Sequence, residues 1–218
     1  MNPYTEALYQ NYARLGKALS TPARIALLAL LEQAPYSVED LAELSGLSVA
    51  NTSQHLQHLR RAGLVSAHKK GLHVFYQLAS PQVQACLQSL ADLAHSQLAE
   101  VREIEAHFLV EAQAWQSVAL NELQTRLEAG ALLVDVRPAA EYQAAHLPEA
   151  VSMPLPELHQ RLHELPKDRE VIAYCRGPYC VFALQAVQLL QKEGLRAAHF
   201  RPGLSKWREA QKPVVSGL

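Results

Sequence analysis

Residues 171–190 read VIAYCRGPYCVFALQAVQLL, and this stretch places Cys175 and Cys180 between an apolar run and a helical pattern. The run over 171–173 indicates a buried β-strand, and apolar residues at three-to-four spacing predict a helix over 181–193. The two cysteines therefore flank a tight loop that leads from a strand into a helix. Such a loop is a reactive site, a metal site or an ordinary turn.

The chemistry of this position favours an anionic sulfur. A thiol between a strand end and a helix start meets inward-pointing backbone N–H groups and the positive helix end, which lower the pKa of the thiol. Arg176 is expected to add a fixed positive charge, Gly177 to permit a special backbone conformation, and Pro178 to rigidify the turn. A Cys-x₄-Cys pair lacks the two further Cys or His ligands of a zinc site.

The second half of the chain alternates between two kinds of segment. Short β-prone runs are expected at 131–137, 150–155, 170–175 and 197–203, and helical segments at 119–129, 138–145, 156–164 and 181–193. This alternation predicts an α/β domain with a parallel sheet. We place the domain boundary between residues 1–116 and 117–218.

Residues 133–155, 171–190 and 201–207 resemble a single rhodanese domain that covers about 119–212. The resemblance implies that Cys175 attacks the sulfane sulfur of thiosulfate or of a persulfide, carries it as a persulfide and passes it to an acceptor. It also implies scaffold roles for Asp135, Arg137 and His146, and no cofactor. The active-site loop continues through Arg176, Gly177, Pro178, Tyr179, Cys180 and Val181, and its length is the one associated with sulfur transfer rather than phosphoryl transfer.

Cys180 departs from the rhodanese pattern, in which a hydroxyl or a cation commonly ends the loop. A second thiol there could resolve the Cys175 persulfide and close a disulfide. The pattern near the end of the domain is also reduced, to Pro202-Gly203. Cys86 is read as a small core or interface residue, and a redox role for it stays open.

The first half of the chain has the order of a winged helix-turn-helix: short helix, tight turn, polar helix, basic hairpin. Residues 45–80 contain arginine, lysine and four histidines but no Asp or Glu, which indicates an anionic partner. Val49, Leu56 and Leu59 are expected to pack inward. The predicted DNA-binding residues are Ser48, Asn51, Thr52, Ser53, Gln54, His55, Gln57 and His58 on the polar helix, with Arg60, Arg61, Lys69 and Lys70 for phosphate contact.

Residues 15–79 resemble the arsenic-repressor (ArsR) family of bacterial winged-helix repressors. The resemblance implies a homodimer that binds double-stranded DNA at an inverted-repeat operator, with the helices at 4–19 and 82–115 forming the dimer surface. From Pro81 to Trp115, apolar residues at three-to-four spacing predict one helix of eight or nine turns. The arsenic-type cysteine pair is absent, and Asp92, His95, His107 and Glu111 do not match the family's zinc spacing.

Composition supports a cytoplasmic protein. No apolar run approaches the length of a membrane span, the polar start is no signal peptide, and three cysteines do not read as a secreted disulfide framework. We therefore expect a transcriptional regulator that acts as a repressor and responds to reactive sulfur. Two alternatives stay open: an active thiosulfate or persulfide sulfurtransferase with an autoregulatory DNA-binding domain, and an arsenite- or metal-responsive repressor.

Overall fold

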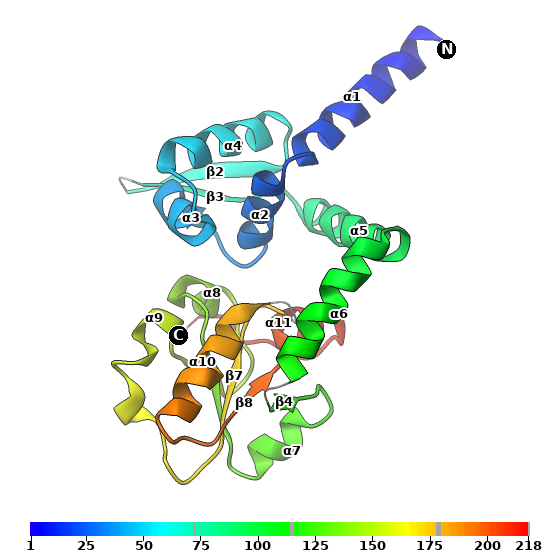
Figure 1. Cartoon of the computed structure of the whole chain (residues 1–218). Helices are drawn as coiled ribbons and strands as arrows, with labels where there is room; N and C mark the ends of the chain where they lie inside the picture. The colour runs from blue at the N-terminus through cyan, green and yellow to red at the C-terminus, as the bar shows by residue number, and fades with distance from the viewer. Residues whose placement is uncertain (72, 114–115, 178–179, 218) are drawn as a thin grey trace. The chain divides into compact units, whose positions relative to one another are not determined.

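The computed structural model describes residues 1–71, 73–113, 116–177 and 180–217, with the backbone alone over 108–113 (Figure 1). The chain divides into two compact units, Met1–Ala94 and His95–Leu218, which are described separately. The functional domain boundary between residues 116 and 117 stays a prediction. Within the described residues, every helix is too short or too polar to cross a bilayer.

The first unit is a winged helix-turn-helix, as predicted. Its helices and strands are, in chain order, α1 Pro3–Leu19, α2 Pro22–Leu31, β1 Tyr36–Ser37, α3 Val38–Ser45, α4 Val49–Arg61, β2 Val65–Lys70, β3 His73–Leu78 and the greater part of α5 Pro81–Gln97. The three strands form an antiparallel sheet of order β1-β3-β2, and β2 and β3 form the predicted hairpin.

Local signals in the sequence fix the ends of α3 and α4. Ser37 and Asp40 form a capping box in which each side chain accepts from the other residue's backbone N–H at 3.1 Å. Gly46 ends α3 with a φ of 70°, a conformation that glycine adopts without steric cost. Ser48 then caps α4 by accepting from the Asn51 N–H at 3.3 Å. A buried core that includes Leu28, Leu41 and Leu56 holds α2, α3 and α4 together.

The prediction of one helix from Pro81 to Trp115 is wrong. Helix α5 ends at Gln97, and a second helix, α6, runs over Ala99–Gln113; Trp115 lies outside the described residues. The Nη1 atom of Arg102 donates to the carbonyl oxygens of His95 and Ser96 at 2.9 and 3.1 Å. These carbonyls lie in the last turn of α5, so the side chain takes the place of the N–H groups that a continuing helix would supply.

The second unit contains the predicted parallel sheet, with strand order β4-β8-β7-β5-β6. Its elements after α6 are β4 Ser117–Val118, α7 Leu123–Glu128, β5 Leu132–Asp135, α8 Ala139–Ala144, β6 Val151–Ser152, α9 Leu155–Leu158, a 3₁₀ turn Leu162–Glu164, β7 Val171–Tyr174, α10 Val181–Lys192, β8 Ala197–Phe200 and α11 Gly203–Glu209. The sequence patterns did not predict β4 or α11.

Strand β7 lies between two hydrophobic cores. Alternate residues point to opposite faces of a strand, so Ala173 and Cys175 pack with α10 in one core, whereas Ile172 and Tyr174 pack with α11 in the other. All four residues of β7 are buried. Cys175 therefore directly follows the carboxyl end of a central parallel strand. Open α/β sheets bind their ligands at this edge.

Candidate DNA interface and cysteine site

The two cysteines of the loop are joined. Cys175 follows β7, and Cys180 is the N-cap residue of α10. Their Cα atoms lie 6.1 Å apart, within the range that a disulfide spans, and the bond is formed. Cys175 has 2% exposure, whereas Cys180 is half-buried. In this state both sulfur atoms are engaged in the bond, so neither cysteine is a free thiol.

Helix α11 braces the first half of the loop. The N–H groups of Leu204 and Ser205 donate to the carbonyl oxygens of Cys175 and Arg176 at 3.0 and 2.8 Å. A Cβ atom on Gly203 would lie 2.6 Å from the Cys175 oxygen and 2.7 Å from the Gly177 nitrogen, so only glycine fits. The carbonyl groups at the start of the loop are thus turned toward α11.

Cys180 and Val181 form the end of the loop. The Cys180 N–H donates to the Gly177 oxygen at 3.1 Å and closes the turn, and Val181 begins α10 with 45% exposure. Pro178 and Tyr179, which belong to the predicted loop, lie outside the described residues.

Arg176 does not supply the free positive charge expected of it. Its guanidinium donates from Nε and Nη2 to the carboxylate of Glu141, a fully buried residue of α8, at 2.5–3.1 Å. The same guanidinium lies 5.3 Å from the centre of the Phe182 ring. Because the partner is negatively charged, the pair contributes little net charge to the loop. No local pattern indicates this pairing, since the partners lie 35 residues apart.

The residues predicted to have scaffold roles connect β5 to β7 through side-chain contacts. Arg137 donates to both oxygens of Asp135, at 2.9 and 2.6 Å, and to the Ala145 carbonyl at 2.7 Å. The Tyr174 hydroxyl donates to Asp135 at 2.6 Å and accepts from the Leu147 N–H at 3.0 Å. Burial, with the charge of Asp135, raises the pKa of Tyr174 far above its ordinary value. His146 stacks on the Tyr142 ring at 3.7 Å.

His199, in β8, is a buried titratable group that sequence reasoning missed. It has 3% exposure, and its Nδ1 lies 3.2 Å from the Gln116 carbonyl oxygen. Its Nε2 is buried without a hydrogen-bond partner among the described residues. Burial first, and then the charge of Arg201, lower the pKa of His199 below its ordinary value.

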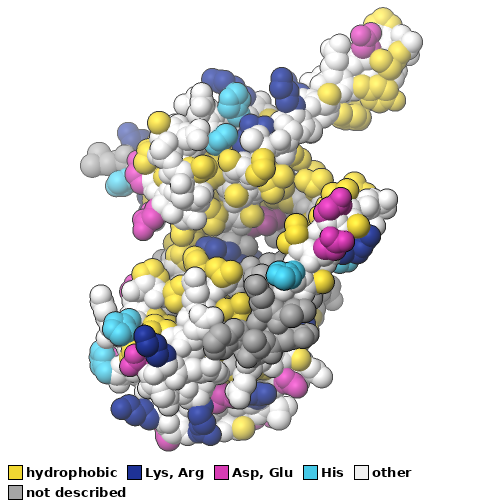
Figure 2. Space-filling model, in the orientation of Figure 1, with side chains coloured by type: hydrophobic (Ala, Val, Ile, Leu, Met, Phe, Trp, Pro, Cys, Tyr) yellow, Lys and Arg dark blue, Asp and Glu magenta, His cyan; other side chains and the backbone are white. Residues whose placement is uncertain are grey.

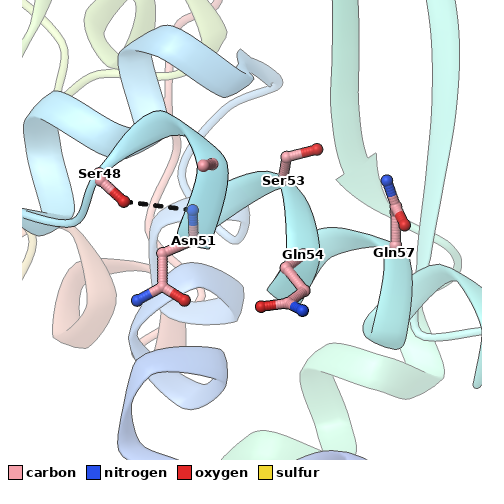
Figure 3. Close-up of a pocket in the computed structure, with 6 residues that line it drawn as sticks. Ser48, Asn51, Ser53, Gln54 and Gln57 are labelled. Carbon is pink, nitrogen blue, oxygen red and sulfur yellow. Dashed lines mark hydrogen bonds between the residues drawn. The ribbon is translucent and has the colours of Figure 1, made fainter.

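Helix α4 presents a neutral polar face with amide groups at successive turns. Ser48, Asn51, Ser53, Gln54 and Gln57 line a shallow depression together with Ala50, and Figure 3 shows the labelled side chains along one side of the helix. Asn51, Gln54 and Gln57 are exposed. Their amides carry both a donor and an acceptor, which is what a base edge in the major groove requires.

Two expectations for α4, those for Thr52 and Val49, need correction, whereas the one for His55 stays a prediction. Thr52 is completely buried and its hydroxyl donates to the Ser48 carbonyl at 3.0 Å, so it cannot contact a base. His55 is half-buried and its Nδ1 atom is enclosed. Val49 is 49% exposed, because the first turn of α4 extends beyond the core that Leu56 and Leu59 enter as predicted.

Basic side chains flank this neutral face. Arg60 and Arg61 lie in the last turn of α4, and Lys69 and Lys70 end strand β2 at the tip of the hairpin; all four are exposed, as is His58. Figure 2 shows Lys, Arg and His side chains along this side of the unit. Charges at both ends of a neutral reading surface suit contacts to phosphates beside a groove.

Cys86 and the candidate metal ligands belong to helices α5 and α6. Cys86 is an exposed, free thiol on α5 rather than a buried core residue. His95 pairs with Glu105 at 2.5 Å across the α5–α6 turn. Among the residues whose placement is described, no three His, Cys, Asp or Glu side chains come together as metal ligands would.

Comparison with known families matches both halves of the chain. Residues 21–67 match the model of the bacterial regulatory proteins of the arsR family, and residues 119–210 match the rhodanese-like domain.

Individual relatives cover one half or the whole. The HTH-type transcriptional regulator Rv0324 of Mycobacterium tuberculosis is 39% identical over 212 residues, 97% of this chain and 93% of that protein. A sulfurtransferase of Allochromatium vinosum is 35% identical over 86 residues, 39% of this chain and 78% of that one. The solved homodimeric winged helix-turn-helix domain of Mb0332 from Mycobacterium bovis is 31% identical, covers 46% of this chain and 93% of that one, and has a TM-score of 0.43.

The match to Rv0324 covers nearly the whole length of both proteins, so the two halves occur together in that relative. The chain therefore belongs to the ArsR family of transcriptional regulators and carries a rhodanese-like domain after its winged helix-turn-helix.

Proposed function

We propose that this regulator is a cytoplasmic repressor that senses reactive sulfur through the Cys175–Cys180 pair. The observation that carries the proposal is that two thiols of a rhodanese-like loop lie close enough to bond in a protein whose other unit is built to bind DNA. Disulfides in cytosolic proteins are mostly catalytic or redox-sensing, which fits a bridge that opens and closes.

The chemistry takes two displacements. The Cys175 thiolate attacks the sulfane sulfur of thiosulfate, the sulfur–sulfur bond of the donor breaks, and sulfite leaves with the bonding electrons. Cys175 now carries a persulfide. The Cys180 thiol then loses its proton and attacks the inner sulfur of that persulfide, which expels hydrosulfide and leaves the disulfide. The sulfane sulfur is the oxidant, so no other electron acceptor is required.

The DNA contacts divide by charge. Asn51, Gln54 and Gln57 offer hydrogen bonds to base edges and specify sequence. The basic residues, which include Arg60 and Lys69, bind phosphates and set the affinity. The arrangement fits a recognition helix in the major groove with the hairpin against the backbone.

A homodimer fits the apolar side chains that the first unit leaves exposed. Tyr4, Leu8 and Tyr12 on α1 are 88%, 49% and 58% exposed, and Leu93 on α5 is 57% exposed. Exposed apolar residues at three-to-four spacing indicate a helix that packs on a partner. The related Mycobacterium bovis domain is described as homodimeric. Two copies would read the two halves of an inverted repeat.

A second candidate function is sulfurtransferase activity with an autonomous DNA-binding unit. The similarity to the Allochromatium vinosum sulfurtransferase favours it. Steady-state transfer of sulfur from thiosulfate to cyanide, lost in Cys175→Ser, would support this candidate. A sensor without turnover gives at most one equivalent of product.

The deciding experiment measures operator binding by the reduced and the polysulfide-treated protein, with mass spectrometry of the peptide that bears both loop cysteines. We expect treatment to change operator affinity in the wild type and not in Cys175→Ser, with Cys86→Ser behaving as the wild type. The ratio of the two affinities measures the coupling between the sites. Equal affinity in both states of the wild type would remove the sensing function.

A further inference from the structure

The carboxylate of Glu141 fixes Arg176, the residue that follows the nucleophilic cysteine. One carboxylate oxygen accepts from Arg176 Nε at 3.0 Å and from Nη2 at 2.5 Å, and the other lies 3.1 Å from Nε. The Glu141 side chain is fully buried, whereas that of Arg176 keeps 22% exposure. The guanidinium also lies over the Phe182 ring, 5.3 Å from its centre. The charged side chain of the residue after Cys175 is thus held by a buried carboxylate of α8.

We propose that Glu141 is a positioning residue that cancels the charge of Arg176, so that Arg176 contributes little to the ionisation of Cys175. This inference rests on the proposed function, because it concerns the reactivity of the same cysteine. It assigns to α8, an element outside the loop, the control of the loop's charge.

The charges around Glu141 support this assignment. Asp135, Arg137, Glu141 and Arg176 form a chain of two acids and two bases, in which Glu141 also lies 3.6 Å from Arg137 Nη1. A carboxylate in contact with a guanidinium acts at a distance as a dipole rather than as a charge, so its effect on a neighbouring sulfur is much weaker. With Glu141 in place, Arg176 gives the Cys175 thiolate little stabilisation.

Other ionisable groups lie on the elements that flank the loop. They include Tyr174 on β7, His199 and Arg201 at β8, Lys192 on α10, and Lys206, Arg208 and Glu209 on α11. A comparison of variants at positions 141 and 176 leaves these groups unchanged, so their contribution is common to every variant. The difference between variants therefore reports the Glu141–Arg176 pair.

The test uses the reduced full-length protein with Cys180→Ser, which prevents the bridge. The rate of iodoacetamide alkylation of Cys175 is followed against pH by mass spectrometry of its peptide, and the exposed thiol of Cys86 serves as an internal reference. Neither a sulfur donor nor DNA is present. Failure of the proposed sulfur response would therefore leave this result unaffected, and the reverse also holds.

We expect Glu141→Gln to lower the midpoint of the Cys175 profile by about half to one pH unit, because Arg176 then acts as an uncompensated cation. Arg176→Gln raises the midpoint, since the negative charge of Glu141 then lacks its contact with Arg176. The double variant returns to the midpoint of the parent, and Glu141→Asp, which keeps the charge, stays close to it. The Cys86 profile is the same in all of them.

Two results would overturn the inference. A double variant with the raised midpoint of Arg176→Gln would mean that Arg176 stabilises the thiolate directly. Unmoved midpoints in both single variants, with changes only in thermal stability, would mean that the pair has a structural role alone. Should Glu141→Gln fail to fold, the comparison of Arg176→Gln with the double variant still decides between these outcomes.

Discussion

Cys175, at the end of β7, and Cys180, at the N-cap of α10, lie with their Cα atoms 6.1 Å apart. At this distance the two sulfur atoms bond within one short loop. Closing or opening the bond acts on the N-cap residue of a 12-residue helix. The redox state of the loop is thus linked directly to a helix end.

Cys180→Ser should trap the sulfur on Cys175. Treatment with polysulfide adds one or more sulfur atoms to the peptide that bears both positions, because no thiol remains to expel hydrosulfide. The wild type loses two hydrogens instead and releases sulfide, which a colorimetric assay measures. Release of sulfide by the serine variant at the wild-type rate would show that Cys180 is not the resolving thiol.

Gln54→Ala should flatten the sequence preference of the operator. An amide that makes two hydrogen bonds to adenine contributes about 1–3 kcal/mol of discrimination, and the truncated side chain makes neither. Binding is measured on a selected operator and on duplexes changed at single base pairs. The loss should be confined to one position in each half-site. A uniform loss of affinity on every duplex would contradict a base-reading role.

Lys69→Ala is the matched substitution for phosphate contact. Binding to all sequences should weaken alike, and the slope of log K against log salt should fall by about one for each protomer that makes the contact. Titrations at several salt concentrations measure both quantities. An effect limited to one operator sequence would remove Lys69 from the phosphate contacts.

Gly203→Ala should destabilise the second unit by about 2 kcal/mol or more, because the added Cβ meets the Cys175 oxygen at 2.6 Å and φ is positive. Gly194→Ala is its control, since φ there is +79° and nothing lies within 4 Å of the added Cβ. The control should lose only about 1–2 kcal/mol from the backbone conformation. Equal losses in thermal unfolding would mean that the close contact relaxes at no cost.

Acid should destabilise the second unit in part through His199. Its folded-state pKa lies below the ordinary value of 6.5, so the unfolded chain binds more protons once the pH falls through that value. The free energy of unfolding is then unaffected by His199 well above pH 6.5 and falls below it, by up to about 1.4 kcal/mol per pH unit. Chemical denaturation between about pH 7 and pH 5 should show a shallower fall in His199→Asn. Identical curves would exclude this source.

Periodicity was enough to predict most of the fold, because caps and apolar spacing act locally. The strand before Cys175, the helix after it and the hairpin at Lys69-Lys70 all follow from such signals. The break after Gln97 could not be foreseen, since the apolar stripe continues across it and the interruption depends on the Arg102 side chain. Strand β4 has two residues, too few to show a period.

The cysteine loop and the reading helix were identifiable, but the partners of their side chains were not. Glu141 reaches Arg176 only because α8 and the loop meet at one edge of the sheet, a relation that spacing along the chain does not encode. Thr52 is different: it lies at three-to-four spacing before Leu56 and Leu59, so its burial was available from the pattern.

Because Gly203 contacts the cysteine loop, the loop cannot be transferred alone to another protein. A graft of residues 174–182 onto another sheet would leave behind the two amides that orient its carbonyl groups and the one residue small enough to lie against them. A transfer to a new scaffold would have to include residues 203–205 together with the loop, even though more than twenty residues separate the two segments in the sequence.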